Sequence, residues 1–192
     1  MVFSGNNFEN QTFSNISCPR EDLNGKEFYN CTIKKCDFSN CKFSGALFID
    51  CVFEGTNLSN IKIDDSSFQG VKFENCKILG VDFSYLKTLL IEWSFIRCVI
   101  EFCNFNKLEI HKTKFVDCTI KNCDFVNTDL QEADFSSSDL QGSKFQNTNL
   151  RKADFSSAIN YYINPTQNNI KQAKFSYPQV LSLLDMFEID VG

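Results

Sequence analysis

The sequence predicts an all-β solenoid, because three features recur with a five-residue period. An apolar residue, the central position, occupies every fifth place. A small residue lies two places before it, and Gly, Asn or Asp lies two places after it, at the corner position. The stretch from Cys31 to Phe53 shows all three features. Gly, Asn and Asp tolerate positive φ, so the corner positions predict sharp changes of chain direction.

The first run of repeats extends from Phe3 to Phe83. All seventeen of its central positions are apolar, and fourteen of its first sixteen corner positions, from Gly5 to Gly80, are Gly, Asn or Asp. An α-helix would not tolerate this density of Gly and Asn, and the alternation of a half-buried strand has a period of two. The repeating unit is therefore a short extended segment followed by a corner.

Residues 84–89 shift the phase by two positions. The repeat resumes at Leu90 and continues through fourteen apolar central positions to Phe155, alternating Phe with Leu or Ile. Trp93 falls on a small position, where an indole does not fit an unchanged turn. We expect a local bulge or an altered turn around residues 84–95, and not a domain boundary. A functional loop is the alternative reading.

Composition narrows the function classes. A chain of 192 residues with 43% hydrophobic residues suits one domain with a substantial core. Its net charge of −5 disfavours direct nucleic-acid binding by counterion release. The chain opens without a basic leader, and no apolar stretch approaches a membrane span. The expectation is therefore a cytoplasmic protein that does not contact a membrane.

The ten cysteines follow the repeat. Nine occupy small positions and Cys18 occupies a central position, which predicts reduced, buried thiols packed as small hydrophobes. Disulfides and a zinc site are the weaker readings, since there is no CxxC pair and the only histidine, His111, lies on an outward position. We therefore expect no metal and no cofactor.

The repeat fades after Phe155. Residues 160–172 predict a turn-rich connection, and Pro178 marks the start of a C-terminal α-helix. The helix carries a wide apolar stripe, which predicts an end cap, a dimer interface, or both. The tail from Glu188 to Gly192 is a candidate short strand. The expected interface residues are Val180, Leu181, Leu183, Leu184 and Phe187.

The segment Ala-Asp-Phe-Ser-Ser, at residues 133–137 and again at 153–157, resembles the consensus of the pentapeptide-repeat family. This resemblance implies a right-handed quadrilateral β-helix of about eight coils, with four repeats in each twenty-residue coil. The chain then divides into a β-helix over residues 1–158, with its phase break at 84–89, and a connection, helix and tail over 159–192.

Twenty-residue coils stack like residues on one another. Phe8, Phe28, Phe48 and Phe68 would form one ladder, and Leu90, Ile110, Leu130 and Leu150 another. The same register places like charges side by side, Glu109 beside Asp129 and Asp134 beside Asp154, an arrangement that costs stability. This observation suggests an acidic belt that binds a partner. Its candidate residues are Glu109, Asp124, Asp129, Glu132, Asp134, Asp139 and Asp154.

No phosphate loop, nucleophile signature or paired-carboxylate motif appears, so we expect a protein that is not an enzyme. A catalytic function near Tyr85 and Trp93 has no supporting residues. Within the family, the chain is similar to Qnr-type quinolone-resistance proteins, and most of all to their loop-free relatives. That resemblance implies a homodimeric DNA mimic that binds a type II topoisomerase, DNA gyrase or topoisomerase IV. The alternative is a scaffold that binds an unrelated protein through its β faces.

Overall fold

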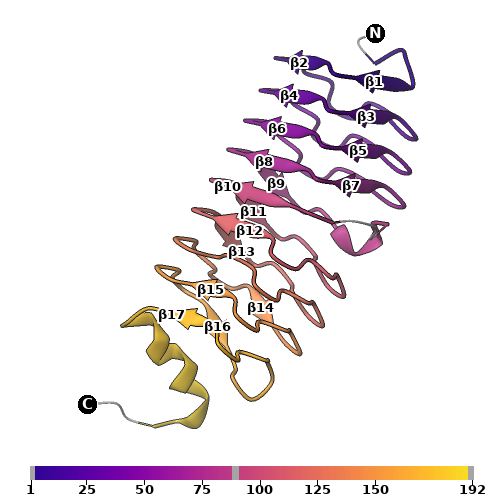
Figure 1. The fold of residues 1–192 in the computed structure, drawn as a ribbon. Coiled ribbons are helices and arrows are strands. Elements are labelled where there is room, and N and C mark those ends of the chain that lie inside the picture. The colour runs from indigo at the N-terminus through magenta and orange to yellow at the C-terminus, as the bar shows by residue number, and fades with distance from the viewer. Residues whose placement is uncertain (1–2, 88–90, 190–192) are drawn as a thin grey trace.

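The computed structural model is a β-solenoid of about eight turns, built from parallel strands and closed by one short helix (Figure 1). It describes residues 3–87 and 91–189. The turns are stacked along one axis, and the N-terminus and the helix lie at opposite ends of the rod. Leu90 and the last three tail residues, about which predictions were made above, lie outside the described residues.

The strands are two or three residues long and pair only in parallel. One sheet contains β1 (Asn7–Glu9), β3 (Glu27–Tyr29), β5 (Leu47–Ile49) and β7 (Ser67–Gln69). The longest sheet contains β2 (Thr12–Ser14), β4 (Thr32–Lys34), β6 (Val52–Glu54), β8 (Lys72–Glu74), β10 (Ser94–Ile96) and β12 (Lys114–Val116). A third contains β9 (Lys77–Leu79), β11 (Val99–Glu101) and β13 (Thr119–Lys121).

Most turns contain twenty residues, so that Phe8 lies opposite Phe28. The turn at the phase break contains two more: Phe73 lies opposite Phe95 and Ile78 opposite Ile100. A short 3₁₀ helix, η1 (Phe83–Tyr85), lies in this longer turn and projects from the rod in Figure 1.

Trp93 is buried in the longer turn and is only 3% exposed. Its ring packs against Phe83 and Phe95 at centroid distances of 5.5 and 5.9 Å. Its indole Nε1–H donates to the carbonyl oxygen of Phe68 at 2.9 Å. The larger turn thus accommodates an indole at a small position and satisfies its only donor.

Parallel pairing continues beyond residue 158. Strand β14 (Lys144–Phe145) pairs with β16 (Tyr162–Ile163) across eighteen residues. The twenty-residue spacing returns where β15 (Asp154–Phe155) pairs with β17 (Lys174–Phe175). The segment around Asn164 takes up the two-residue difference between these registers, so much of the connection forms part of the stack.

The C-terminal helix, η2 (Gln179–Phe187), is a 3₁₀ helix and not the α-helix predicted from the sequence. The sequence Gln-Val-Leu, Ser-Leu-Leu, Asp-Met-Phe repeats one polar and two apolar residues with a period of three. A 3₁₀ helix has three residues per turn, so this period forms one polar row and two apolar rows. After the helix, Glu188 adopts a left-handed conformation and neither it nor Ile189 is in a strand.

The residues at the small positions occupy little volume and also donate hydrogen bonds. Many of them donate to the carbonyl oxygen of a central residue 23 residues earlier, as Cys51 does to Phe28 at 3.4 Å and Ser138 to Phe115 at 2.6 Å. Nine of the ten cysteines are buried, as predicted, and all ten are free thiols. Burial raises the pKa of Cys51 to about 12, which keeps this thiol protonated and able to donate.

Candidate partner-binding surface

The acidic belt lies on the C-terminal stack, residues 95–155, whose four faces we name after their central residues. In chain order they are the Ile110, Phe115, Ile120 and Phe125 faces. On each face, the residue just before the central position points outward and lies beside its equivalents in neighbouring turns. The bridges place Glu109 beside Asp129 on the Ile110 face, as the twenty-residue spacing predicts.

The structure brings five of the seven belt residues together on two adjacent faces. Two of them lie on the Ile110 face, two lie on the Phe115 face, and one lies on the corner between those faces. We call this group the acidic pentad: Glu109, Asp129, Glu132, Asp134 and Asp154. The other two candidates lie elsewhere, Asp139 on the Ile120 face and Asp124 on the Phe125 face.

Several belt carboxylates have a basic neighbour that the sequence analysis did not identify. The basic group lies one turn away, at a spacing of eighteen or twenty residues, so the repeat itself contained the signal. The nitrogen–oxygen distances are 3.4 Å for Lys144–Asp124, 3.2 Å for His111–Asp129, 3.1 Å for Lys152–Glu132, 3.0 Å for Lys121–Asp139 and 2.8 Å for Lys174–Asp154. Exposed ion pairs of this kind contribute little stability, but the four lysines among these neighbours reduce the local negative potential.

The pairing lowers the pKa of three of these carboxyl groups. The hydrogen bond from Lys152 lowers the pKa of Glu132. Burial alone would raise the pKa of Asp154, but hydrogen bonds from Lys174 and Ser156 outweigh burial and lower it. Asp139 behaves in the same way, because bonds from Asn160 and Lys121 lower its pKa against the effect of burial. All three groups are therefore firmly ionised near neutral pH.

Belt aspartates also stabilise the corners of the repeat. The Oδ1 atom of Asp134 accepts the backbone N–H of Ser136 at 2.9 Å, and Asp129 accepts that of Gln131 at 3.0 Å. Asparagine does the same at Asn149, so this bond requires an acceptor oxygen and not a charge. The two properties can therefore be separated by Asp→Asn substitution.

The expected interface residues lie on η2, the helix that closes the rod. None of its residues is fully buried, although Leu183 packs against the core. The Oγ–H of Ser182 donates to the Tyr161 carbonyl at 3.4 Å and links the helix to the stack. Val180, Leu181 and Leu184 remain partly exposed, and Phe187 is 50% exposed. One end of the rod thus presents a partly uncovered apolar surface.

Sequence comparison identifies the repeat. The family model for the pentapeptide repeat region matches residues 26–92 and 90–161. The chain belongs to the pentapeptide-repeat family. No curated protein matches it in sequence.

Solved structures of QnrB1, a plasmid-mediated fluoroquinolone resistance protein, have a similar fold. One trypsin-treated variant matches with a TM-score of 0.70 and 17% identity, over 97% of this chain and 99% of that one. A second trypsin-treated variant has a TM-score of 0.66 and 22% identity, over 99% and 93%. The full-length protein has a TM-score of 0.54 and 16% identity, over 95% and 100%. These structural matches establish a shared fold.

This pentapeptide-repeat protein also exposes the aromatic residues Tyr85 and Phe102, of which the sequence analysis named Tyr85 but not Phe102. Phe102 occupies a corner position at φ 56° and is 64% exposed, although bulky residues avoid this conformation. Tyr85, in η1, is 62% exposed. The sequence signal for Phe102 was an aromatic residue at a position that elsewhere favours Gly, Asn or Asp.

The described residues contain no cluster of three or more His, Cys, Asp or Glu side chains able to hold a metal ion. Within residues 3–87 and 91–189, no helix has the length and apolar character needed to cross a membrane.

Proposed function

We propose that this protein binds a type II topoisomerase, DNA gyrase or topoisomerase IV, and modulates it or protects it from fluoroquinolones. The acidic pentad would take the place of a stretch of DNA phosphates on the enzyme. Binding of this kind requires no catalytic group, and the protein would act without chemistry of its own.

The observation that carries the proposal is the nearly end-to-end match to QnrB1, which covers 97% of this chain and 99% of the other. A rod of similar length can present its faces to a partner at the same spacing. The acidic pentad adds a reason for choosing a DNA-binding enzyme. Two pairs of like charges adjoin on neighbouring turns, an arrangement that selection for stability alone would tend to remove.

A supercoiling assay with purified DNA gyrase, with and without a fluoroquinolone, tests this proposal. We expect the protein to inhibit supercoiling or to protect it from the drug. The double variant Asp129→Lys/Asp134→Lys should weaken the effect by at least about tenfold, a loss of about 1.4 kcal/mol of binding free energy. Asp129→Asn/Asp134→Asn should weaken it less and keep the corner hydrogen bonds.

The matched control is Asp124→Lys/Asp139→Lys, which changes the net charge equally on the other two faces. It should retain most of the effect. Equal losses in the two charge-reversed variants would show that only net charge matters and would contradict a role for the pentad. Absence of any effect from the folded native protein, with either enzyme, would reject the proposed function.

We also propose that η2 forms a homodimer interface. The observation that supports this proposal is the partly uncovered apolar surface of η2, which includes Leu184 and the half-exposed Phe187. Analytical ultracentrifugation should find a dimer that Leu184→Glu/Phe187→Glu converts to a monomer. Val99→Glu, at a side chain 39% exposed in the middle of the rod, serves as the control. A native monomer at all accessible concentrations would contradict this assignment.

The second candidate function is an interaction scaffold for an unrelated protein, and Phe102 favours it. A bulky side chain in a left-handed corner costs about 1–3 kcal/mol, and such strain concentrates at functional sites. Phe102→Asn should preserve or increase thermal stability, because Asn suits this corner. If the scaffold reading is right, the variant should also lose a partner captured by native protein while retaining any effect on gyrase.

A further inference from the structure

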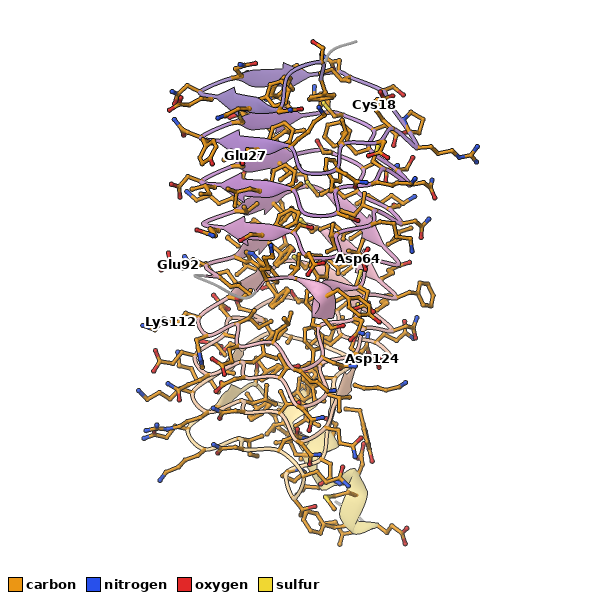
Figure 2. All side chains as sticks on the ribbon, turned by 90° about the vertical axis from the view of Figure 1, so that its right-hand side faces the viewer. Cys18, Glu27, Asp64, Glu92, Lys112 and Asp124 are labelled. Carbon is orange, nitrogen blue, oxygen red and sulfur yellow. The ribbon has the colours of Figure 1, made fainter. Side chains whose placement is uncertain are left out.

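A groove of about 860 Å³ lies at the phase break, on the edge between two faces of the rod. Glu92 and Lys112, which line it, project from the same edge at mid-height, away from Asp64 and Asp124 (Figure 2). It extends from Asp50 to Gln131, about four turns or ~19 Å at the spacing of β-strands.

The longer turn forms the floor of the groove. Trp93 lies there, with its indole N–H fixed on the Phe68 carbonyl. Gly70 lies on the rim with φ +62°, and a Cβ atom at this position would collide with the carboxylate of Asp50. Ile91 adds an apolar contact surface. The groove is thus a structural consequence of the two extra residues.

Three exposed lysines line the groove and outnumber its two carboxylates, Asp50 and Glu92, so the groove carries a net positive charge within an acidic protein. Lys72 and Lys114 lie on β8 and β12, on either side of Ser94 in β10. Lys112 lies on the adjoining corner. None of the three forms an ion pair with another described residue, whereas His111, on the same rim, contacts Asp129 at 3.2 Å.

We propose that this groove binds an extended, acidic segment of a partner protein. Lys72 and Lys114 lie two strands apart in the same sheet, so their backbones are separated by about 9.6 Å. Their two ammonium groups therefore suit carboxylates spread along a chain better than one compact anion. An extended segment of about six residues spans the ~19 Å length. This inference is independent of topoisomerase binding.

Calorimetric titration of the full chain with N-acetylated, C-amidated hexaglutamate tests the proposal. Trp93 is the only tryptophan in the chain and lines the groove, so its fluorescence emission reports where the peptide binds. We expect saturable binding with a shift in this emission. Lys72→Gln/Lys114→Gln should weaken binding by at least about tenfold, as expected when two cations that contact the ligand are removed.

The matched control is Lys42→Gln/Lys62→Gln, which removes two lysines that adjoin on a different face. It should leave the affinity within about twofold, because charges beyond a Debye length are screened. Equal weakening in both variants, binding without a change in Trp93 emission, or no binding would each overturn the proposal. So would tighter binding of tripolyphosphate than of the peptide, since it would indicate a compact anion site.

Discussion

The two stacks on either side of the phase break arrange the same core residue differently. In the C-terminal stack, Phe alternates with Leu or Ile, so Phe ladders occupy only two opposite faces. Phe115 stacks on Phe135 with their ring planes 6° apart, and Phe125 on Phe145 at 3°. Rings of the two ladders meet edge to face, as Phe125 and Phe135 do at 88°.

In the N-terminal stack, residues 3–83, Phe also occupies adjacent faces, as at the consecutive central positions Phe43, Phe48 and Phe53. The rings are then less regular: Phe48 and Phe68 stack with an angle of 24°, and Phe53 meets Phe68 at a tilted 36°. The square interior therefore holds two Phe ladders in a regular arrangement, and additional rings tilt to fit.

The largest expected difference comes from truncating one ring in each stack. Phe125→Ala should cost about 3–5 kcal/mol of unfolding free energy, and Phe53→Ala should fall at or below the low end of that range. Both side chains are fully buried. Tilted neighbours in the N-terminal stack can move into the vacated volume, whereas stacked and edge-to-face rings are fixed. Urea denaturation measures both, and an equal or larger loss for Phe53→Ala would contradict the comparison.

A smaller difference concerns the donors at the small positions. The C-terminal stack uses hydroxyl groups at several of these positions, such as Ser138 at 2.6 Å from the Phe115 carbonyl, beside thiols such as Cys118. The N-terminal stack uses mainly thiols, such as Cys76 at 3.3 Å from the Phe53 carbonyl. Ser138→Ala should cost about 1–2 kcal/mol, because it removes a strong bond to a buried acceptor.

Cys76→Ala should cost less through its hydrogen bond, because a thiol is a weak donor, although it also removes a buried sulfur. Ser138→Cys helps to separate the two effects: it keeps a donor at this position but weakens the bond, and its sulfur is somewhat larger than the hydroxyl oxygen. We expect it to lose part of the free energy lost by Ser138→Ala. Denaturation curves in which Ser138→Cys is as unstable as Ser138→Ala would show that volume and geometry, and not donor strength, control this position.

Most of the fold was predictable because each repeat buries the same positions in every turn. Phe and Cys at fixed five-residue spacing determine which side chains point inward, whereas the twenty-residue register came from the resemblance to the pentapeptide-repeat family. The 3₁₀ form of η2 was missed because its apolar residues also fit an α-helical stripe; the period of three was the distinguishing signal. The basic neighbours of the belt, such as Lys174 beside Asp154, were missed because the twenty-residue register was used to pair acidic residues with one another and not with basic residues. The groove depends on how two extra residues are accommodated around Trp93, which local sequence patterns do not specify.

The smallest expected difference between the stacks is in their response to acid. The pKa of Asp154 and the pKa of Asp139 both lie below the ordinary value for Asp. The pKa of Asp37, in the N-terminal stack, is also lowered, mainly by the hydrogen bond that Asp37 accepts from the backbone N–H of Ser39. A carboxyl group with a lowered pKa in the folded state stabilises the fold above its unfolded pKa, about 3.9, and this contribution is lost as the pH falls through the folded value.

Urea midpoints should therefore decrease below about pH 4. Asp154→Asn/Asp139→Asn should reduce that decrease more than Asp37→Asn does, because it removes two such groups. An unchanged pH dependence in the double variant would show that these ion pairs do not stabilise the C-terminal stack.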